Sequence, residues 1–159
     1  MNNIKLKDHM QIVVFSLDEP RYALDLSTVE RVVRAVEITP LPKAPEIVLG
    51  VINMQGQVVP VVDVRKRFRL PEREINIDDR FIISRTSRRL VALVADDVIG
   101  VQKLENREIV SAEQALPFAE YIKGVAKMEE DLVLIYDLDR FLSLDEEQKL
   151  DEALSGGAI

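Results

Sequence analysis

The sequence predicts an all-β protein built from two similar lobes, each a small barrel of about five strands. Three observations lead to this fold class. The 159-residue chain is 47% hydrophobic but only 5% aromatic, so its core is aliphatic and rich in Val and Ile, which suit strands. Short apolar runs alternate with turns along the chain. The second half also repeats the pattern of the first, and each half of about 70 residues is small for a domain that folds alone.

The first half begins with a predicted hairpin. The run Gln11–Leu17 is apolar and rich in β-branched residues, Pro20 ends it, and the alternating segment 22–26 pairs back on it. Residues 27–30 (STVE) have capping-box spacing, which predicts a brief helical turn. A third strand is expected over 31–38.

A loop with three prolines, residues 39–46, leads into the most strongly patterned stretch of the chain, GVINMQGQVVPVVDVRKRF, residues 50–68. Two apolar arms flank the Gln55-Gly56 dipeptide and predict a hairpin that turns there. Asp63 is placed to cap a short helix, VRKRF.

The second half is predicted to contain four strands and a C-terminal helix. The strands are 80–84, 90–104, 122–128 and 131–138. Residues 129–130 form the turn between the last two, and 137–154 is expected to be helical with a frayed tail at 155–159. Capping-box spacing recurs from Ser143 to Glu146, and a weak apolar stripe is expected at Leu144, Leu150 and Leu154.

The internal repeat appears at two offsets. Shifting by 74 residues matches Gly50 with Gly124, Met54 with Met128 and Asp63 with Asp137. Shifting by 69 residues matches Ile12 with Phe81, Ala23 with Ala92, Val29 with Val98 and Val32 with Val101. Chance similarity of Val-rich hairpins is the alternative, but it does not explain the repeated Gly, Met and Asp.

These patterns divide the chain into an N-terminal arm (1–10), one domain (11–144) and a C-terminal helix and tail (145–159). The domain comprises two pseudo-repeated lobes, about 11–75 and 76–142, which are free to exchange strands.

Charge is unevenly distributed, although the net charge is −7. Residues 63–89 contain nine Lys/Arg and five acids, whereas 129–152 contain ten acids and two bases. The basic cluster 65–69 has three interpretations: a solvated helix face, a protein contact or a nucleic-acid contact. Overall acidity and the lack of interleaved aromatic residues argue against nucleic acid, so a small nucleic-acid-binding barrel is kept only as an alternative.

No residue pattern indicates catalysis, a metal or a cofactor. The chain has no Cys and a single histidine, His9, expected to be an ordinary surface residue of the N-terminal arm. Neighbouring carboxylates at 78–79, 96–97 and 129–131 fall at turns or strand ends, where a structural role is expected. A hydrolase with unrecognised carboxylates is the one enzymatic alternative. No apolar run is long enough for a membrane helix, and a cytoplasmic protein is expected.

The stretch 50–68 resembles the signature of CheW-like chemotaxis coupling proteins, roughly G-V-x-N-L-R-G-x-V-x-P-V-x-D-L-R-x-x-F. Further matches are TPLPKAP (39–45), VALVADDVIGV (91–101) and YIKGVAKMEEDLVLIYDLDRFL (121–142). The resemblance extends over about 12–142. It implies two five-stranded SH3-like β-barrel lobes with an aliphatic groove between them.

The resemblance also implies a non-enzymatic adaptor without a cofactor. Such proteins bind the cytoplasmic tip of chemoreceptors (methyl-accepting chemotaxis proteins) and the regulatory domain of the CheA-type histidine kinase, in receptor arrays at the membrane. Carried over position by position, the partner-contact residues would include Val29, Gly50, Asn53, Gly56, Val98 and Val101. Ordinary core packing is the alternative for each valine.

Three residues depart from the family pattern and are added to the candidate contact set. Gln55 replaces the usual arginine, Arg31 replaces the usual acid, and Arg80 stands where an apolar residue is common. In the family the first two positions often carry opposite charges and can meet. The departures indicate an altered receptor preference, as in an auxiliary coupler of a chemosensory pathway that controls pili, gliding or development.

Overall fold

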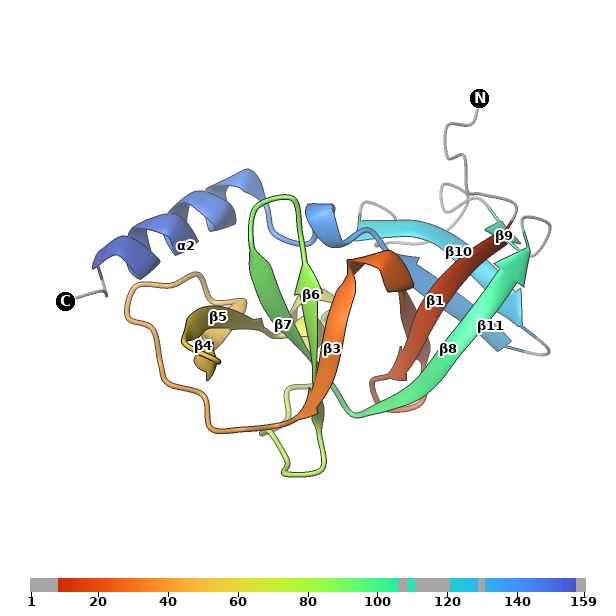
Figure 1. The fold of residues 1–159 in the computed structure, drawn as a ribbon, viewed down its shortest axis with the longest axis horizontal. Coiled ribbons are helices and arrows are strands. Elements are labelled where there is room, and N and C mark those ends of the chain that lie inside the picture. Colours follow the sequence, from red (N-terminus) through yellow and green to blue (C-terminus); the bar gives the residue numbers. More distant parts are fainter. Residues whose placement is uncertain (1–8, 106–108, 111–120, 129–130, 157–159) are drawn as a thin grey trace.

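The computed structural model describes residues 9–105, 109–110, 121–128 and 131–156, which form two β-sheets and a C-terminal helix (Figure 1). Sheet A has the strand order β8-β1-β2-β11-β10-β9 and sheet B the order β3-β6-β7-β5-β4. The strands of sheet A are β1 (His9–Ser16), β2 (Arg21–Asp25), β8 (Asp97–Glu105), β9 (Ile109–Val110), β10 (Ile122–Met128) and β11 (Asp131–Tyr136). Those of sheet B are β3 (Val29–Arg34), β4 (Val48–Met54), β5 (Gln57–Val62), β6 (Arg80–Arg85) and β7 (Leu90–Ala95).

The predicted all-β fold with two SH3-like lobes is confirmed, with one correction. Each lobe is an open sheet and not a closed barrel, because in the described part of the chain β3 and β4 are the outer strands of sheet B and pair with no further strand. Sheet A has five corresponding strands, to which the two-residue β9 adds a short edge. Strands β3 and β8 are therefore edge strands, and most of their described side chains are exposed or only partly buried.

The two sheets exchange strands between the repeated halves of the sequence. Sheet A combines β1 and β2 with β8, β10 and β11, whereas sheet B combines β6 and β7 with β3, β4 and β5. When equivalent strands are matched, both sheets have the same order, and the β2–β11 and β5–β7 pairs are both parallel. The sequence repeat is thus also a repeat of topology. The sheets do not coincide with the contiguous segments 11–75 and 76–142.

The predicted single strand over 90–104 is wrong, because the chain leaves sheet B at Ala95 and enters sheet A at Asp97. The corner residue, Asp96, accepts a 2.6 Å hydrogen bond from the backbone N–H of Asp18 in the β1–β2 turn. Its backbone N–H in turn donates to the carbonyl oxygen of Ser16 at 2.9 Å. These bonds fix the bend where the two lobes meet.

The Gln55-Gly56 hairpin and the short helix after it are confirmed. Helix α1 (Val64–Arg67) begins at Asp63, whose side chain accepts a 3.2 Å hydrogen bond from the N–H of Lys66. The predicted cap at residues 27–30 is wrong. The 3₁₀ turn η1 (Leu26–Thr28) is capped by Asp25, which accepts from the N–H of Ser27 at 3.0 Å.

The C-terminal helix begins later than predicted. The segment 137–154 contains a 3₁₀ turn, η5 (Leu138–Arg140), and then α2 (Leu144–Gly156), which extends into the predicted tail. The capping box is confirmed: Ser143 N–H donates to Glu146 Oε1 at 2.9 Å, and Glu146 N–H donates to Ser143 Oγ at 3.1 Å. The expected stripe is corrected at Leu144, which is 77% exposed, whereas Leu150 is fully buried.

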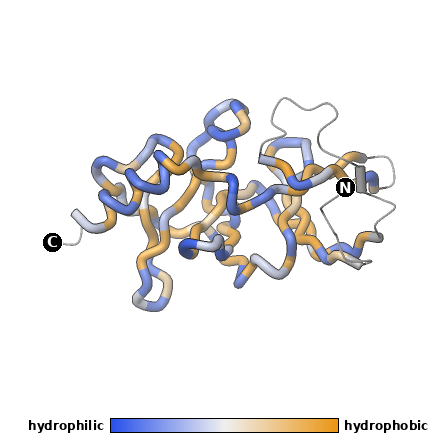
Figure 2. The backbone as a smooth tube through the Cα atoms, turned by 90° about the horizontal axis from the view of Figure 1, so that it is seen from above, coloured by the Kyte–Doolittle hydropathy of each residue, from blue (hydrophilic) through white to orange (hydrophobic). Residues whose placement is uncertain are grey.

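Within the described residues, three hydrophobic clusters form the core. One cluster lies between the sheets and includes Phe15 and Leu24 of sheet A, Ile82 and Leu93 of sheet B, and Leu150 of α2. The opposite face of each sheet forms a second cluster, whose buried residues all come from that sheet. Hydrophobic residues accordingly run along the strands in Figure 2, while hydrophilic residues concentrate at the turns and along α2. We call the cluster between the sheets the shared core.

Some predicted features lie outside the described residues. These are residues 1–8 of the expected N-terminal arm and the turn at 129–130, whereas His9 begins β1. None of the described helices has the length and apolar character needed to cross a membrane.

Candidate protein-interaction site

Two predicted contact residues, Val29 and Val98, lie at equivalent places in the two lobes. Val29 begins edge strand β3, Val98 lies near the start of edge strand β8, and both are partly buried against the shared core. The register explains this position, because Val29 lies opposite Ser84 of β6 and Val98 lies opposite Phe15 of β1. Each valine therefore has one side in the core and the other toward solvent.

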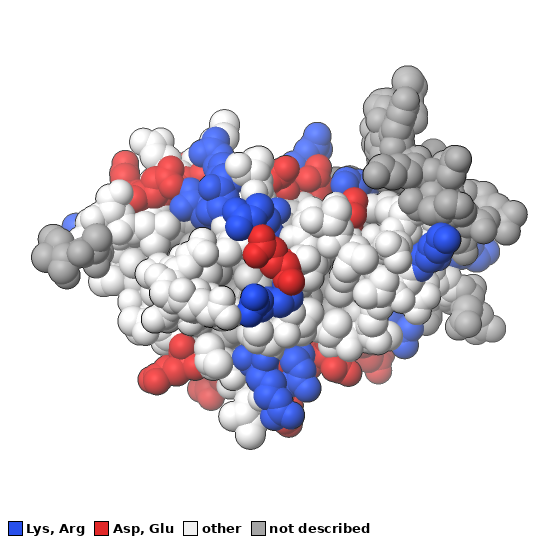
Figure 3. Space-filling view, viewed as in Figure 1, with Lys and Arg blue, Asp and Glu red and all other residues white. Residues whose placement is uncertain are grey.

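The next equivalent pair, Val32 and Val101, is more exposed. Val32 lies opposite Ile82 in β3, and Val101 opposite Val13 in β8. Their side chains are 39% and 53% exposed. Both edge strands face the viewer in Figure 1, and uncharged residues cover much of the same view in Figure 3. We call Val29, Val32, Val98 and Val101 the valine face.

The contact set predicted from the sequence contains Val101 but not Val32. The internal repeat contained the necessary signal, because an offset of 69 residues matches Val32 with Val101.

Three other candidates, Asn53, Gln55 and Gly56, form one hairpin turn. Gln55 has φ +56° and Gly56 has φ +88°, as a two-residue type I′ turn requires at its central positions. Asn53 Oδ1 accepts a 2.7 Å hydrogen bond from the Gly56 N–H. All three residues are exposed, so the turn is an accessible tip of sheet B. Asn53 and Gly56 also have a structural role, because the hydrogen bond between them holds the turn.

Gly50 is buried and has an intramolecular role. A Cβ atom at this position would lie 2.3 Å from the carbonyl oxygen of Thr39. Thr39 and Val51 exchange backbone hydrogen bonds of 2.9 and 2.8 Å, which hold the proline-containing loop across β4. This glycine therefore allows the chain's own proline-containing loop to approach β4 closely.

Arg31 and Arg80 do not share a face of sheet B. Arg31 lies opposite Ile83, whereas Arg80 lies opposite Arg34, so the two side chains project to opposite faces. Arg31 belongs to edge strand β3 and Gln55 to the turn at the other edge, and in the described part of the chain no hydrogen bond joins them.

The basic residues of 65–89 mostly form ion pairs within the molecule. Arg65, only 7% exposed, donates to both carboxylate oxygens of Asp18 at 2.9 and 3.0 Å, and to Asp96 at 2.8 Å. Arg73 donates to Asp79 at 2.9 Å and also to Asp96. These five residues, which we call the junction network, connect the β1–β2 turn, α1 and the β7–β8 corner. The sequence predicted only turn or strand-end positions for these carboxylates.

The network shifts the ionisation of its members. Hydrogen bonds from Arg65 lower the pKa of Asp18, against a smaller opposing effect of burial. Burial by itself would raise the pKa of Asp96, but the hydrogen bonds from the Asp18 N–H, Arg65 and Arg73 outweigh it and lower that pKa. Hydrogen bonding to Asp18 likewise raises the pKa of Arg65. The pKa shifts of Asp18, Asp96 and Arg65 therefore all favour the charged forms of these groups.

Two further arginines hold α2 against the body of the protein. Arg67 pairs with Glu146 and lies over the ring of Tyr121, 5.1 Å from its centroid. Arg89 pairs with Glu147 at 3.1 Å and also with Asp151. Since these cations are already neutralised, the nucleic-acid alternative loses its main support.

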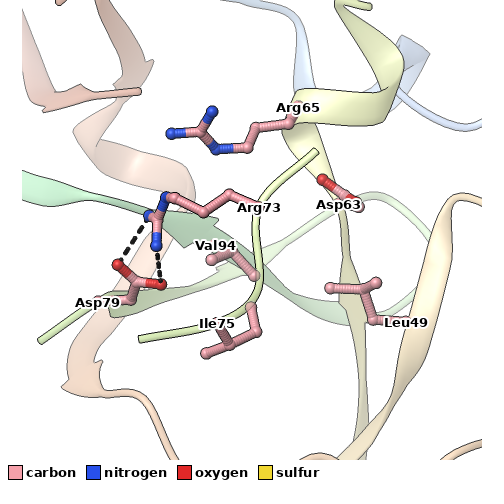
Figure 4. A pocket seen from close by; sticks show the side chains of 7 residues that line it. All are labelled: Leu49, Asp63, Arg65, Arg73, Ile75, Asp79 and Val94. Atoms are coloured by element: carbon pink, nitrogen blue, oxygen red, sulfur yellow. Dashed lines mark hydrogen bonds and ion pairs between the residues drawn. The ribbon is translucent and has the colours of Figure 1, made fainter. Parts of the chain in front are cut away.

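The recess beside the junction network is too small for an organic ligand. Its volume is about 10 Å³, room for a single water. Figure 4 shows Arg73 and Asp79 paired at one side of it, with Leu49 at the other. Among the described residues, no group of three or more His, Asp or Glu is arranged to hold a metal ion.

Comparison with known proteins identifies the family. A family model, the CheW-like domain, matches residues 11–146.

The chain belongs to the CheW-like family.

Relatives within the CheW-like family cover most of the chain. The chemotaxis protein CheW of Treponema pallidum is 28% identical over 149 residues, which is 90% of this chain and 88% of that protein. CheW of Bacillus subtilis is 30% identical, over 91% of this chain and 94% of that protein. Protein FrzA of Myxococcus xanthus is 27% identical over 65% of each.

A solved CheW structure has the same fold. The crystal structure of the scaffolding protein TtCheW from Thermoanaerobacter tengcongensis superposes with a TM-score of 0.80 at 32% identity, covering 86% of this chain and 94% of that one. The CheW-like match spans every candidate residue from Val29 to Val101, and it confirms the resemblance read from residues 50–68.

Proposed function

We propose that this protein is a non-enzymatic adaptor that couples chemoreceptors to a CheA-type histidine kinase. The observation that supports this most directly is the valine face. Each lobe carries one partly buried and one exposed valine at equivalent positions on an edge strand. A protein that joins two others needs two separate surfaces, and the repeated fold supplies two of similar chemistry.

The proposed mechanism is binding alone. Stiff β-branched side chains such as Val32 and Val101 suit an amphipathic helix, so a helical hairpin at a receptor's cytoplasmic tip would place its apolar stripe on the valines of one lobe. The regulatory domain of the kinase would occupy the remaining lobe surface. Because the shared core and the junction network join the lobes, partners bound to each would be held in a fixed relative geometry. The protein would act in the cytoplasm at membrane receptor arrays.

The test is a binding experiment with a chemoreceptor cytoplasmic fragment and a CheA-type regulatory domain encoded in the same genome. We expect the wild-type protein to bind both, and Val32→Asp or Val101→Asp to weaken binding of one of them at least tenfold, by placing a charge in an apolar contact. Ile77→Asp is the matched control, since Ile77 is 83% exposed on the 71–79 loop. Binding of the wild-type protein to neither partner would exclude the proposal.

A second candidate is an auxiliary coupler of a non-flagellar chemosensory pathway. It is supported by Gln55 and Arg31, which replace the usual charges, and by the relative FrzA, which is not named for chemotaxis. If these residues set receptor preference, Gln55→Arg combined with Arg31→Glu should strengthen binding to a receptor of the usual flagellar type. Unchanged affinity in the single and double variants would count against this candidate.

A further inference from the structure

We propose that Arg34 and Arg80 form a cationic anchor beside Val32, and that it binds a carboxylate-rich segment of the protein that docks on sheet B. This inference rests on the proposed adaptor function, and it adds that the partner segment bound at this place is negatively charged. We call the two residues the arginine pair.

The register of sheet B places the two arginines side by side. Arg34 is the last residue of edge strand β3, Arg80 is the first of β6, and the two are directly paired. Directly opposed residues have Cβ atoms about 4.5–5.5 Å apart and project to the same face. Val32 and Ile82 form the next pair on that face. The positive charges therefore adjoin Val32.

The protein supplies no carboxylate to this pair among its described residues. Arg80 donates to the backbone carbonyl oxygens of Asp78 and Asp79, at 2.7 and 3.3 Å. The carboxylate of Asp79 is instead held by Arg73 and by the N–H of Asn76 at 2.8 Å. Arg34 is exposed and forms no ion pair with any residue that the structure describes. Each guanidinium therefore has donors left for a partner.

This arrangement contrasts with several other arginines of the lobe. Arg65, Arg73, Arg85 and Arg89 all pair with carboxylates of this chain, and the chain as a whole has a net charge of −7. Like charges directly opposite each other on neighbouring strands are destabilising. An unneutralised pair at an exposed strand end is unfavourable in the free protein and becomes favourable when a partner brings acidic groups.

The position of the pair also predicts how the partner is oriented. Val32 supplies the apolar contact, and the arginines lie at one end of it, where β3 ends and β6 begins. Arg31 projects to the other face and is not part of the anchor. A partner with an apolar stripe and acidic residues at one end of that stripe would fit in one direction only.

The experiment measures binding of the receptor cytoplasmic fragment and of the kinase regulatory domain over a range of salt concentrations. It compares the wild-type protein, Arg34→Gln/Arg80→Gln and the control Arg88→Gln/Arg69→Gln. Arg88 and Arg69 are exposed and form no ion pair with another described residue, so the control removes the same charge elsewhere. For one partner, we expect the anchor variant to bind about three- to tenfold more weakly at low salt, chiefly through slower association, and to lose most of its salt dependence.

Three other results are informative. If the wild-type protein binds but the anchor variant matches the control in affinity and salt slope, the arginine pair is not an anchor and the adaptor function stands. If the wild-type protein binds neither partner, the adaptor function fails and this inference fails with it. If the melting temperature of the anchor variant falls while its salt slope is unchanged, the pair is structural and the inference is overturned.

Discussion

Gly50 shows how a single residue position ties the family signature to the fold. It belongs to the stretch that resembles CheW-like proteins, yet its lack of a side chain serves the contact with Thr39. Its φ of +152° also lies in a region that other residues rarely adopt. The glycine of the signature is therefore explained by the packing of the proline-containing loop on β4.

We therefore predict that Gly50→Ala lowers the free energy of unfolding by about 2–4 kcal/mol, because backbone strain and the clash with Thr39 act together. Urea denaturation measures the loss. Gly100→Ala is the matched control, since Gly100 has φ +144° but a Cβ there would meet nothing within 4 Å. Equal losses in the two variants would show that the contact with Thr39 contributes nothing.

For single residues, local sequence patterns were enough to predict the turn at Gln55-Gly56 and the cap at Asp63. The roles of Gln55, Gly56 and Asp63 follow from φ preferences and hydrogen bonds within a few residues. Val29, Val98 and Val101 entered only through the family resemblance, because an exposed valine on an edge strand looks like any other valine in the sequence.

At the scale of elements, α2 is attached to the protein by one apolar face. Leu150 is fully buried in the shared core, and Ala153 is buried beside it on the same helix. Hydrogen bonds from Arg67 and Ser143 lower the pKa of Glu146 although burial alone would raise it, so the ionised carboxylate keeps the helix start in place.

We predict that Leu150→Ala costs about 2–4 kcal/mol of stability, because it leaves a cavity where the helix meets the core. Leu144→Ala, at a residue that is 77% exposed on the same helix, should change stability by less than about 0.5 kcal/mol. Urea denaturation compares the two, and hydrogen exchange of α2 shows whether the helix detaches. A small effect of Leu150→Ala would mean that α2 is not docked in solution.

The break between β7 and β8 shows why one element boundary was missed. Residues 90–104 form an apolar run in which no proline occurs, and the single glycine lies beyond the corner. The bend is fixed by Asp96 through Asp18 and Arg65, which are 78 and 31 residues away along the chain. Local sequence patterns contain no information about such partners. The internal repeat could be found in the sequence. How the repeated strands are divided between the two sheets depends on this corner and could not.

For the whole molecule, the junction network makes the connection between the lobes sensitive to acid. A carboxylate whose pKa is lowered by folding stabilises the protein above its unfolded pKa, near 4, and that contribution disappears as the pH falls through the folded value. Asp18 and Asp96 both have lowered pKa values. Stability should therefore decline as the pH falls below about 4, as these groups take up protons.

We predict that Asp96→Asn lowers stability by about 1–3 kcal/mol at pH 7, because hydrogen bonds to a charged group are lost. Its unfolding free energy should also vary less than that of the wild-type protein between about pH 5 and pH 2. Urea denaturation across this range tests both effects. Asp78→Asn, at an exposed carboxylate without an ion pair to another described residue, should leave the pH profile unchanged. Parallel profiles for wild type and Asp96→Asn would contradict the assigned role of the network.

If the two lobes join a receptor to a kinase by binding alone, receptor control of the kinase requires this protein. The most direct test reconstitutes receptor cytoplasmic fragments on vesicles with the CheA-type kinase and measures kinase autophosphorylation with and without this protein. We predict that receptors change the autophosphorylation rate only when the protein is present, and that Val32→Asp/Val101→Asp abolishes this dependence. A receptor effect that is equally large without the protein would contradict the claim.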